Sequence, residues 1–437
     1  MAHDPMKLPM GRRQLFALGG GALAAGALAA ASGGRVGAMT RRPSGLRVPR
    51  SADLPTIKQW YHQYGEEGTQ AAVERYAAAY EAATVEVTWQ PGDYDQTTVA
   101  SLLTDDGPDV FEYGNGPTID MIQSEQVVPL TDLFTDETRA DFNQSVLGRM
   151  TYQDEIWAIP QVIDMQILVY NIQMLEDAGI DPPETIDDLI AAAAELTKDG
   201  VKGLYLGNNG GADLMGGPML WAAGLNYLTE DNEFGFDDAA AAEAFSKLRE
   251  LWESDSLLLG QPTDWWAADA MVSQQTAMQF TGLWTFPDLD EGLPDGYGAI
   301  PWPAMDGGAK SVPVGAYGSC VSAKAGDVDA AKAFAQWLWI DQTEDQLDFA
   351  TAYGFHIPSR MSLVPEASTL AEGPAADAAA AATEFGVAQN QLLWTPASNS
   401  AFGDMMSRIV KDGADPESEI ADLKSIVDEE LARVTGG

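Results

Sequence analysis

The sequence Ile159-Pro-Gln-Val-Ile-Asp-Met-Gln-Ile-Leu-Val-Tyr-Asn171 decides how the rest of the chain is interpreted. Side chains alternate between the two faces of a β-strand, so one face carries apolar residues such as Met165 and Ile167. The other face begins with Asp164 and Gln166. A carboxylate and an amide in an otherwise apolar strand allow two interpretations. In the first, the strand face that carries Asp164 and Gln166 is simply exposed to solvent. In the second, the strand crosses between two lobes and presents both side chains to a cleft.

Length and composition indicate a globular chain with more than one core. A chain of 437 residues is too long for one compact core, so two lobes are expected. The formal net charge of −42 repels nucleic acid and anionic membrane surfaces. The single cysteine, Cys320, permits neither a disulfide framework nor a thiolate metal cluster. We therefore expect no nucleic-acid partner and no thiolate metal site. We also expect a monomer without metal or cofactor.

The N-terminal part of the sequence has the pattern of an export signal. A twin-arginine pair, Arg12-Arg13, precedes an apolar run rich in glycine and alanine. We assign residues 1–38 to a signal peptide of the twin-arginine type and residues 39–54 to a flexible linker. Within the signal, Ala31 stands where a bacterial lipoprotein box would carry its lipidated cysteine. We expect an extracytoplasmic protein, exported and at the cell surface or secreted, for which a lipid anchor is doubtful.

Strand and helix patterns alternate after the linker. Residues 56–60, 85–89 and 109–111 have strand patterns, with helical periodicity between them. This alternation predicts a parallel sheet with helices on both faces. Ligands in such folds bind at the carboxyl ends of the strands, which are residues 61–65 and 113–116 here.

Two later segments predict helices. Thr185 is a good N-cap, and Asp188 stands at the third position after it. Residues 370–384 consist mostly of alanine and acidic residues, which predicts an exposed helix, with a low-complexity linker as the alternative.

The order of the sequence blocks resembles that of the extracellular solute-binding proteins of sugar-importing ABC transporters, the group that includes maltose-binding protein. The likeness covers nearly all of residues 55–437. The blocks that carry it include Pro91-Gly-Asp-Tyr94, Gly107-Pro-Asp-Val110, Tyr113-Gly-Asn-Gly116, Trp157-Ala-Ile-Pro160, Tyr170-Asn171, Gly282-Leu-Trp284 and Gly354-Phe-His-Ile-Pro-Ser-Arg360. The resemblance rests on the order and spacing of these blocks together.

The resemblance implies a two-lobed α/β fold of the periplasmic-binding-protein type, with central sheets flanked by helices. Hinge crossovers are expected near residues 160–170, 310–315 and 358–360, and the lobes would close on a ligand around them. We assign lobe 1 to residues 55–162 and 311–357, and lobe 2 to residues 163–310 and 358–437. The implied function is capture of a sugar or oligosaccharide, without catalysis, for delivery to the permease subunits of an ABC importer.

A sugar site needs flat rings for the C–H faces of the sugar and polar groups for its hydroxyls. The resemblance implies stacking rings at Tyr113 and Trp284, a hydroxyl partner at Asn115 and a carboxylate at Asp164. The candidate ligand-binding residues are Tyr61, His62, Tyr64, Tyr113, Asn115, Asp164, Gln166, Asn208, Trp221, Trp284, Tyr317 and Trp394.

For several of these residues a structural role is the alternative. Asn115 and Asn208 would then only turn the chain, and Trp221 and Trp394 would pack in the core. Trp265-Trp266 either rims the cleft or covers a helix.

Other classes of protein remain open from the sequence. A secreted glycoside hydrolase needs two neighbouring carboxylates, and Asp164 with Glu112 is the obvious pair, although nothing in the sequence shows that they face each other. A serine hydrolase motif and a His-Glu-x-x-His motif are both absent from the sequence. A binder of a polyamine, an amino acid or a similar solute on the same fold is the main alternative to a sugar binder.

Overall fold

The computed structural model describes residues 54–64 and 66–436. The predicted signal peptide lies outside the described residues, as does the predicted linker except Leu54, so both assignments stay predictions. Within the described ranges, no helix has both the length and the apolar character needed to cross a membrane.

Within the described residues, ten strands form one mixed sheet, whose main path runs β2-β1-β3-β10-β6-β8-β7. Its strands are β1 (Thr56–His62), β2 (Thr84–Gln90), β3 (Val110–Gly114), β6 (Ile159–Asn171), β7 (Lys202–Tyr205), β8 (Thr276–Gly282), β9 (Tyr297–Ile300), β10 (Val312–Val321), β11 (Ile357–Pro358) and β12 (Gly386–Ala388). A separate small sheet pairs β4 (Thr151–Tyr152) with β5 (Glu155–Ile156). The first three strands are parallel, as predicted, whereas β10 runs antiparallel to β3 and β6.

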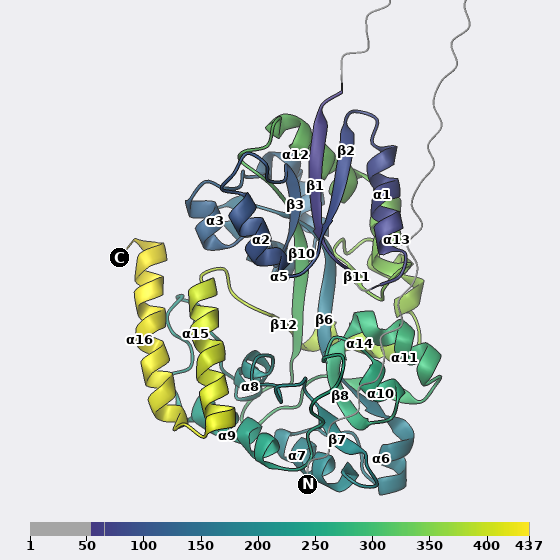
Figure 1. The fold of residues 1–437 in the computed structure, drawn as a ribbon, viewed down its shortest axis with the longest axis vertical. Helices are drawn as coiled ribbons and strands as arrows, with labels where there is room; N and C mark the ends of the chain where they lie inside the picture. Colours follow the sequence, from purple (N-terminus) through teal and green to yellow (C-terminus); the bar gives the residue numbers. More distant parts are fainter. Residues whose placement is uncertain (1–53, 65, 437) are drawn as a thin grey trace, which may run out of the picture. The chain divides into compact units, whose positions relative to one another are not determined.

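Helices cover the sheet in two groups (Figure 1). With the first strands lie α1 (Thr69–Ala79), α2 (Tyr94–Ser101), α3 (Ile119–Gln123), α4 (Asp136–Asp141), α5 (Gln144–Arg149), α12 (Val328–Gln336) and α13 (Thr343–Thr351). The second group comprises α6 (Ile172–Ala178), α7 (Ile186–Leu196), α8 (Gly216–Ala222), α9 (Ala239–Glu253), α10 (Asp269–Val272), α11 (Phe286–Gly292), α14 (Gly373–Phe385), α15 (Pro396–Ser407) and α16 (Pro416–Thr435). Each group has a core of its own, with Tyr76 and Phe334 in the first and Phe245 and Phe402 in the second.

Strand β6 is the crossing strand. Residues 159–165 pair with β10, whereas residues 166–170 pair with β8. Strand β10 crosses as well, because residues 317–321 pair with β3 and residues 312–314 pair with β12. Figure 1 shows β6 and β10 running from the upper elements to the lower ones. The predicted two-lobed α/β fold is therefore confirmed, although its crossing strands merge the two sheets into one.

The structure has helices at both of the later segments for which the sequence predicts one. Thr185 and Asp188 form a reciprocal capping box at the start of α7. The alanine-rich segment is a helix, α14, but it is not simply exposed. Its residues Ala375, Ala378 and Ala381 are buried at a spacing of three, because small side chains let the helix pack closely against β9 and β10.

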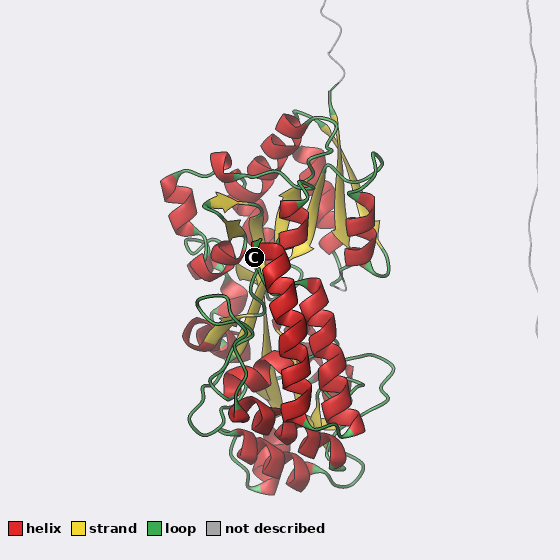
Figure 2. Cartoon of the chain, turned by 90° about the vertical axis from the view of Figure 1, so that its left-hand side faces the viewer, coloured by secondary structure: helices red, strands yellow, loops and turns green. Residues whose placement is uncertain are grey.

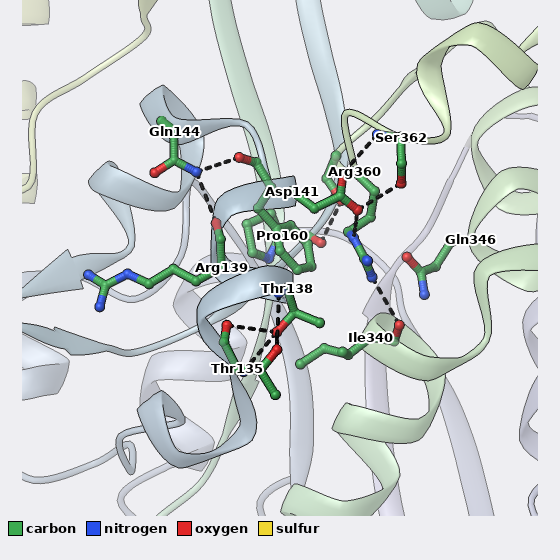
Figure 3. A network of polar contacts seen from close by, with 12 residues as sticks. Thr135, Thr138, Arg139, Asp141, Gln144, Pro160, Ile340, Gln346, Arg360 and Ser362 are labelled. Carbon is green, nitrogen blue, oxygen red and sulfur yellow. Dashed lines mark hydrogen bonds and ion pairs between the residues drawn. The ribbon is translucent and has the colours of Figure 1, made fainter.

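A polar network follows the third predicted crossing, near residues 358–360 (Figure 3). Arg360 Nε donates to Asp141 Oδ2 at 2.6 Å, and Arg360 Nη1 donates to the carbonyl of Ile340 at 3.0 Å. Burial alone would raise the pKa of Asp141, but hydrogen bonds from Ser362 and Arg360 outweigh it and lower that pKa. The network ties the end of α4 to the chain that follows β11.

The two last helices, α15 and α16, lie side by side (Figure 2). The end of α16 also contacts α3 of the first group. Arg433 Nη1 donates to Asp120 Oδ1 at 2.6 Å, and Gln123 Nε2 donates to the carbonyl of Val434 at 2.5 Å. The lobes therefore touch through the C-terminal helix as well as through the crossing strands.

Candidate functional site

A cavity of about 890 Å³ lies where the two lobes meet at the crossing strands. The segment after β1 and the end of β3 form one side of it, and the chain around β8 forms the other. Strands β6 and β10 supply its floor. Seven of the predicted residues line the cavity, namely His62, Tyr64, Asn115, Asp164, Gln166, Trp284 and Tyr317.

Three tryptophans form the wall contributed by the second lobe. The rings of Trp265 and Trp284 meet edge to face, with centroids 5.8 Å apart, and Trp284 Nε1 donates to the carbonyl of Trp266 at 2.9 Å. The Trp266 side chain is 55% exposed. A Cβ atom on Gly282 would lie 2.0 Å from the Trp284 ring, so only glycine lets the indole lie over the end of β8. This contact explains the Gly282-Leu-Trp284 block.

A second aromatic group forms the wall contributed by the first lobe. The rings of His62 and Tyr317 stack with centroids 4.4 Å apart, and Tyr64 packs against His62 at 3.9 Å. Glu112 lies behind these rings and is fully buried. It accepts hydrogen bonds from the backbone N–H of His62 and the hydroxyl of Tyr64, both at 2.8 Å, and contacts His62 Nδ1. Glu112 therefore fixes the aromatic wall from behind.

The carboxylate of Glu112 affects the pKa values of the three rings in front of it. Burial would lower the pKa of His62, but the carboxylate of Glu112, with smaller contributions from Asp164 and Glu66, outweighs burial and raises it. For Tyr64 and Tyr317, burial and Glu112 act in the same direction, and the pKa of each hydroxyl rises well above its usual value. Both phenols therefore stay neutral hydrogen-bonding groups.

A buried histidine links the crossing strand to the loop after β1. His356 Nδ1 lies 2.5 Å from Asp164 Oδ1, and Nε2 lies 3.3 Å from Glu66 Oε1. Burial would lower the pKa of His356, but the two carboxylates raise it to about 10. The ring is therefore a cation at neutral pH, and it holds Asp164 at the cavity floor.

Asn115 forms a turn with its backbone and also lines the cavity. It adopts a left-handed conformation with φ 61°, so the alternative of a simple turn describes its backbone correctly. Its side chain accepts from the backbone N–H of Ala316 at 3.2 Å and donates to Gln389 Oε1 at 3.4 Å. A Cβ atom on Gly315 would lie within 2.8 Å of both side chains, so glycine is needed beside them.

Two predicted aromatic residues of the first lobe do not reach the cavity. Tyr61 precedes His62 in β1 and points to the opposite face, because strand side chains alternate. It is fully buried against Trp89, with ring centroids 5.2 Å apart. Tyr113 is 8% exposed and packs in the hydrophobic cluster around β3 and the crossing strands, whereas its neighbour Glu112 supports the cavity wall.

Three predicted residues of the second lobe also lie elsewhere. The side-chain amide of Asn208 is used within the structure itself. It donates to the carbonyl of Thr263 at 2.9 Å and accepts from the backbone N–H of Gln261 at 2.7 Å. Trp221 and Trp394 are about 5% and 4% exposed, and both pack against Tyr227. Asn208 therefore has the structural role that was the alternative to ligand binding, and Trp221 and Trp394 pack in the core.

Sequence reasoning left several cavity residues out of the candidate set. Glu66, Gln389, His356 and the pair Trp265-Trp266 all line the cavity. His356 had a usable signal, since the whole sequence has three histidines and this one lies in a family-like block. Glu66 and Gln389 had no such signal, because their importance arises only from contacts with residues far away in the sequence.

The pairing that a glycoside hydrolase would need is not formed. Glu112 has a fully buried side chain and is held by His62 and Tyr64, behind the wall instead of at the cavity surface. Asp164 is held by His356. Among the described residues, no group of three or more His, Cys, Asp or Glu side chains is arranged to hold a metal ion.

A second cavity, of about 790 Å³, adjoins the first. The rings of His62, Tyr64 and Tyr317 line both, and Asp93 and Asp95 lie on the far side. Burial, followed by the charge of Asp93, raises the pKa of Asp95. The cleft thus continues past the first-lobe rings toward α2.

Comparison with known proteins places this geometry in context. An uncharacterised ABC transporter extracellular-binding protein of Pyrococcus horikoshii is 29% identical over 280 residues, which cover 59% of this chain and 60% of that protein. The diacetylchitobiose-binding protein DasA of Streptomyces coelicolor is 27% identical over 314 residues, covering 67% of this chain and 69% of that protein. The chain thus aligns with about three fifths of the length of the first relative and about two thirds of the second.

Solved structures support the fold. The GacH receptor of Streptomyces glaucescens, determined without ligand and in complex with acarbose, superposes with a TM-score of 0.74 at 23% identity, covering 86% of this chain and 98% of that one. The sequence profile described as bacterial extracellular solute-binding protein matches residues 64–339, which is more than half of the chain. The chain belongs to the bacterial extracellular solute-binding protein family.

Proposed function

We propose that the protein captures a sugar or oligosaccharide in the cavity between its lobes and delivers it to an ABC importer. The observation that carries this proposal is a cavity with tryptophans on one wall and a histidine–tyrosine stack on the other. Sugars present flat C–H faces that pack on such rings, and relatives that bind diacetylchitobiose and acarbose support the assignment.

Polar groups at the floor suit the hydroxyls of the ligand. Asp164 accepts hydrogen bonds, whereas Gln166 and Gln389 both donate and accept. His356 orients Asp164 through one oxygen, so the other carboxylate oxygen remains for a ligand. The cavity volume of about 890 Å³ lies near the upper end of ordinary small-molecule sites, about 300–1,000 Å³, which favours an oligosaccharide over a single ring.

The mechanism is capture without bond cleavage. Ligand contacts from both lobes favour a closed state, in which the permease subunits of the importer would recognise the protein. We assign ligand contacts to His62, Tyr64, Trp284 and Tyr317 as stacking or edge partners. Export through the twin-arginine signal would place the protein, as a monomer, outside the cytoplasm.

A second candidate ligand is a solute that carries an amine. The acidic residues Glu66, Glu67, Asp164 and Asp288 line the cavity, and none of its described lining residues is a lysine or arginine. Carboxylates beside aromatic rings attract cations as well as hydroxyls. An amino sugar, a polyamine or an amino acid is therefore the alternative to a neutral sugar.

The test is a thermal-shift and tryptophan-fluorescence screen of the purified chain against neutral sugars, amino sugars, polyamines and amino acids. A neutral sugar that stabilises the protein, changes the fluorescence and is recovered unaltered supports the proposal. A hit restricted to polyamines or amino acids moves the assignment to the second candidate. A sugar that is consumed over time would establish an enzyme instead.

A further inference from the structure

A partly buried arginine, with no carboxylate partner among the described residues, lies outside the part of the cleft described above. Arg149 ends α5, and its Nε donates to Asn390 Oδ1 at 2.8 Å. Its Nη1 is shut off from solvent and meets no hydrogen-bond acceptor among the described residues. Burial lowers the pKa of Arg149 to about 10, and no neighbouring carboxylate opposes that shift. The guanidinium is therefore a charge with one fully buried nitrogen and no counter-ion within the described part of the chain.

This arrangement is unexpected in so acidic a protein. The chain has 66 acidic residues against 24 lysines and arginines, so carboxylates are abundant. Arg75, Arg360 and Arg433 each form an ion pair with one. Burying an unpaired charge is costly, and burial is tolerated when an opposite charge and hydrogen bonds compensate it.

The surroundings of Arg149 suit an anion. Arg149 lines a cavity of about 160 Å³ together with Asn143, Ser145 and Thr383, and none of the lining residues that the structure describes is acidic. Asn143 Oδ1 already accepts from backbone N–H groups at the start of α5, so only the amide nitrogen of Asn143 can donate to an anion. One N–H of that nitrogen points to Met361 Sδ at 4.0 Å, and the other is left to donate. The cavity exceeds the ~30 Å³ of one water molecule several-fold, so a polyatomic ion fits.

The position of this cavity connects it to both lobes. Arg149 and Ser145 belong to α5 of the first lobe, whereas Thr383 belongs to α14 of the second. Asn115 and Gly315 line both this cavity and the ligand cleft. A group bound by Arg149 would therefore lie at the boundary between the lobes, separated from the ligand cleft by Asn115 and Gly315.

We propose that Arg149 binds a small oxyanion in this cavity, with the amide of Asn143 and the hydroxyl of Ser145 as further donors. The anion is either a free ion, such as inorganic phosphate, or an acidic group of a ligand that reaches past Asn115 and Gly315 from the cleft. In both cases the negative charge compensates the guanidinium at the boundary between the lobes.

The experiment measures thermal stability of the purified chain while phosphate replaces a bulky sulfonate at constant ionic strength. Three proteins are compared: the wild type, Arg149→Met and Arg139→Met. Arg139 is an exposed arginine of nearby α4, and Figure 3 draws no hydrogen bond or ion pair from its guanidinium. Arg139 is not among the described residues that line the cavity, so its replacement removes the same charge without touching it. A second titration uses a neutral sugar and its uronic acid as ligands.

Loss of a charge-assisted hydrogen-bond partner should weaken oxyanion binding by roughly tenfold or more in Arg149→Met. We expect a saturable rise of the melting temperature with phosphate in the wild type and Arg139→Met, and its loss in Arg149→Met. An Arg149 dependence seen only with the uronic acid also supports the site and identifies the ligand as the source of the anion.

Responses that are equal in all three proteins, or absent for both phosphate and the uronic acid, overturn the proposal. Should Arg149→Met fail to fold, crystals of the wild type soaked in bromide provide the test. An anomalous peak within hydrogen-bonding distance of Arg149 supports the site, and its absence overturns it. Binding of the neutral sugar is recorded in the same buffers, so failure of the proposed function is seen separately.

Discussion

Replacing Trp284 with alanine removes the central ring of the second-lobe wall. The indole makes two contacts that hold it in place, namely the edge-to-face packing with Trp265 and the hydrogen bond to the carbonyl of Trp266. It is half-buried and lines the cavity. The substitution therefore affects ligand binding and stability by amounts that can be worked out separately.

For stability, the aromatic pair contributes about 0.5–1.5 kcal/mol and the hydrogen bond about the same, so the loss is about 1–3 kcal/mol. For binding, one stacked ring contributes about 0.5–1.5 kcal/mol beyond the area that it buries. Adding the lost apolar contact brings the penalty to about 1.4 kcal/mol or more, which is roughly tenfold in Kd.

Isothermal titration calorimetry with the sugar found in the screen measures the change in Kd, and urea unfolding measures the stability. Trp337→Ala is the matched control, because Trp337 is also half-buried but packs on Tyr80 and Phe334 away from the cavity. It should lose stability without losing affinity. An unchanged Kd in Trp284→Ala, with the protein folded, would refute the placement of this ring in the site.

Three further predictions concern the cavity and the hinge. Gly282→Ala should weaken sugar binding in calorimetry although Trp284 is retained, because the new Cβ displaces the indole; unaltered affinity would contradict this. The raised pKa of His356 means that its contribution to stability is complete below about pH 6.5 and is lost as the pH rises through about 10. Urea unfolding should therefore show stability falling across that window, less steeply in His356→Gln; equal slopes would argue against the cluster. Arg360→Met should cost roughly 2–4 kcal/mol by leaving Asp141 half-buried without its partner, whereas adding Asp141→Asn should recover part of the loss. Strictly additive losses in the double variant would exclude that coupling.

The crossing strand could be predicted from the sequence because its signal is local. Period-two alternation places Asp164 and Gln166 on one face, and both reach the cavity. The capping box at Thr185 is local in the same sense, since donor and acceptor are three residues apart. Where one segment supplies both partners of an interaction, the sequence is sufficient.

Contacts between distant segments could not be predicted in this way. Tyr61 and His62 are neighbours in one strand, and only the direction of the sheet decides that His62 faces the cavity while Tyr61 is buried. The same limit applies to Trp394, whose partners fill the core of the second lobe. The contact of His356 with Asp164 spans 192 positions, so no spacing rule could indicate it.

Small-angle X-ray scattering of the purified chain with and without the stabilising sugar tests the central claim most directly. If the two lobes close on a carbohydrate held between their aromatic walls, the radius of gyration should decrease when the sugar is added. It should recover when the unaltered sugar is removed by dialysis. A tight-binding sugar that leaves the radius of gyration unchanged would contradict closure of the lobes around the ligand.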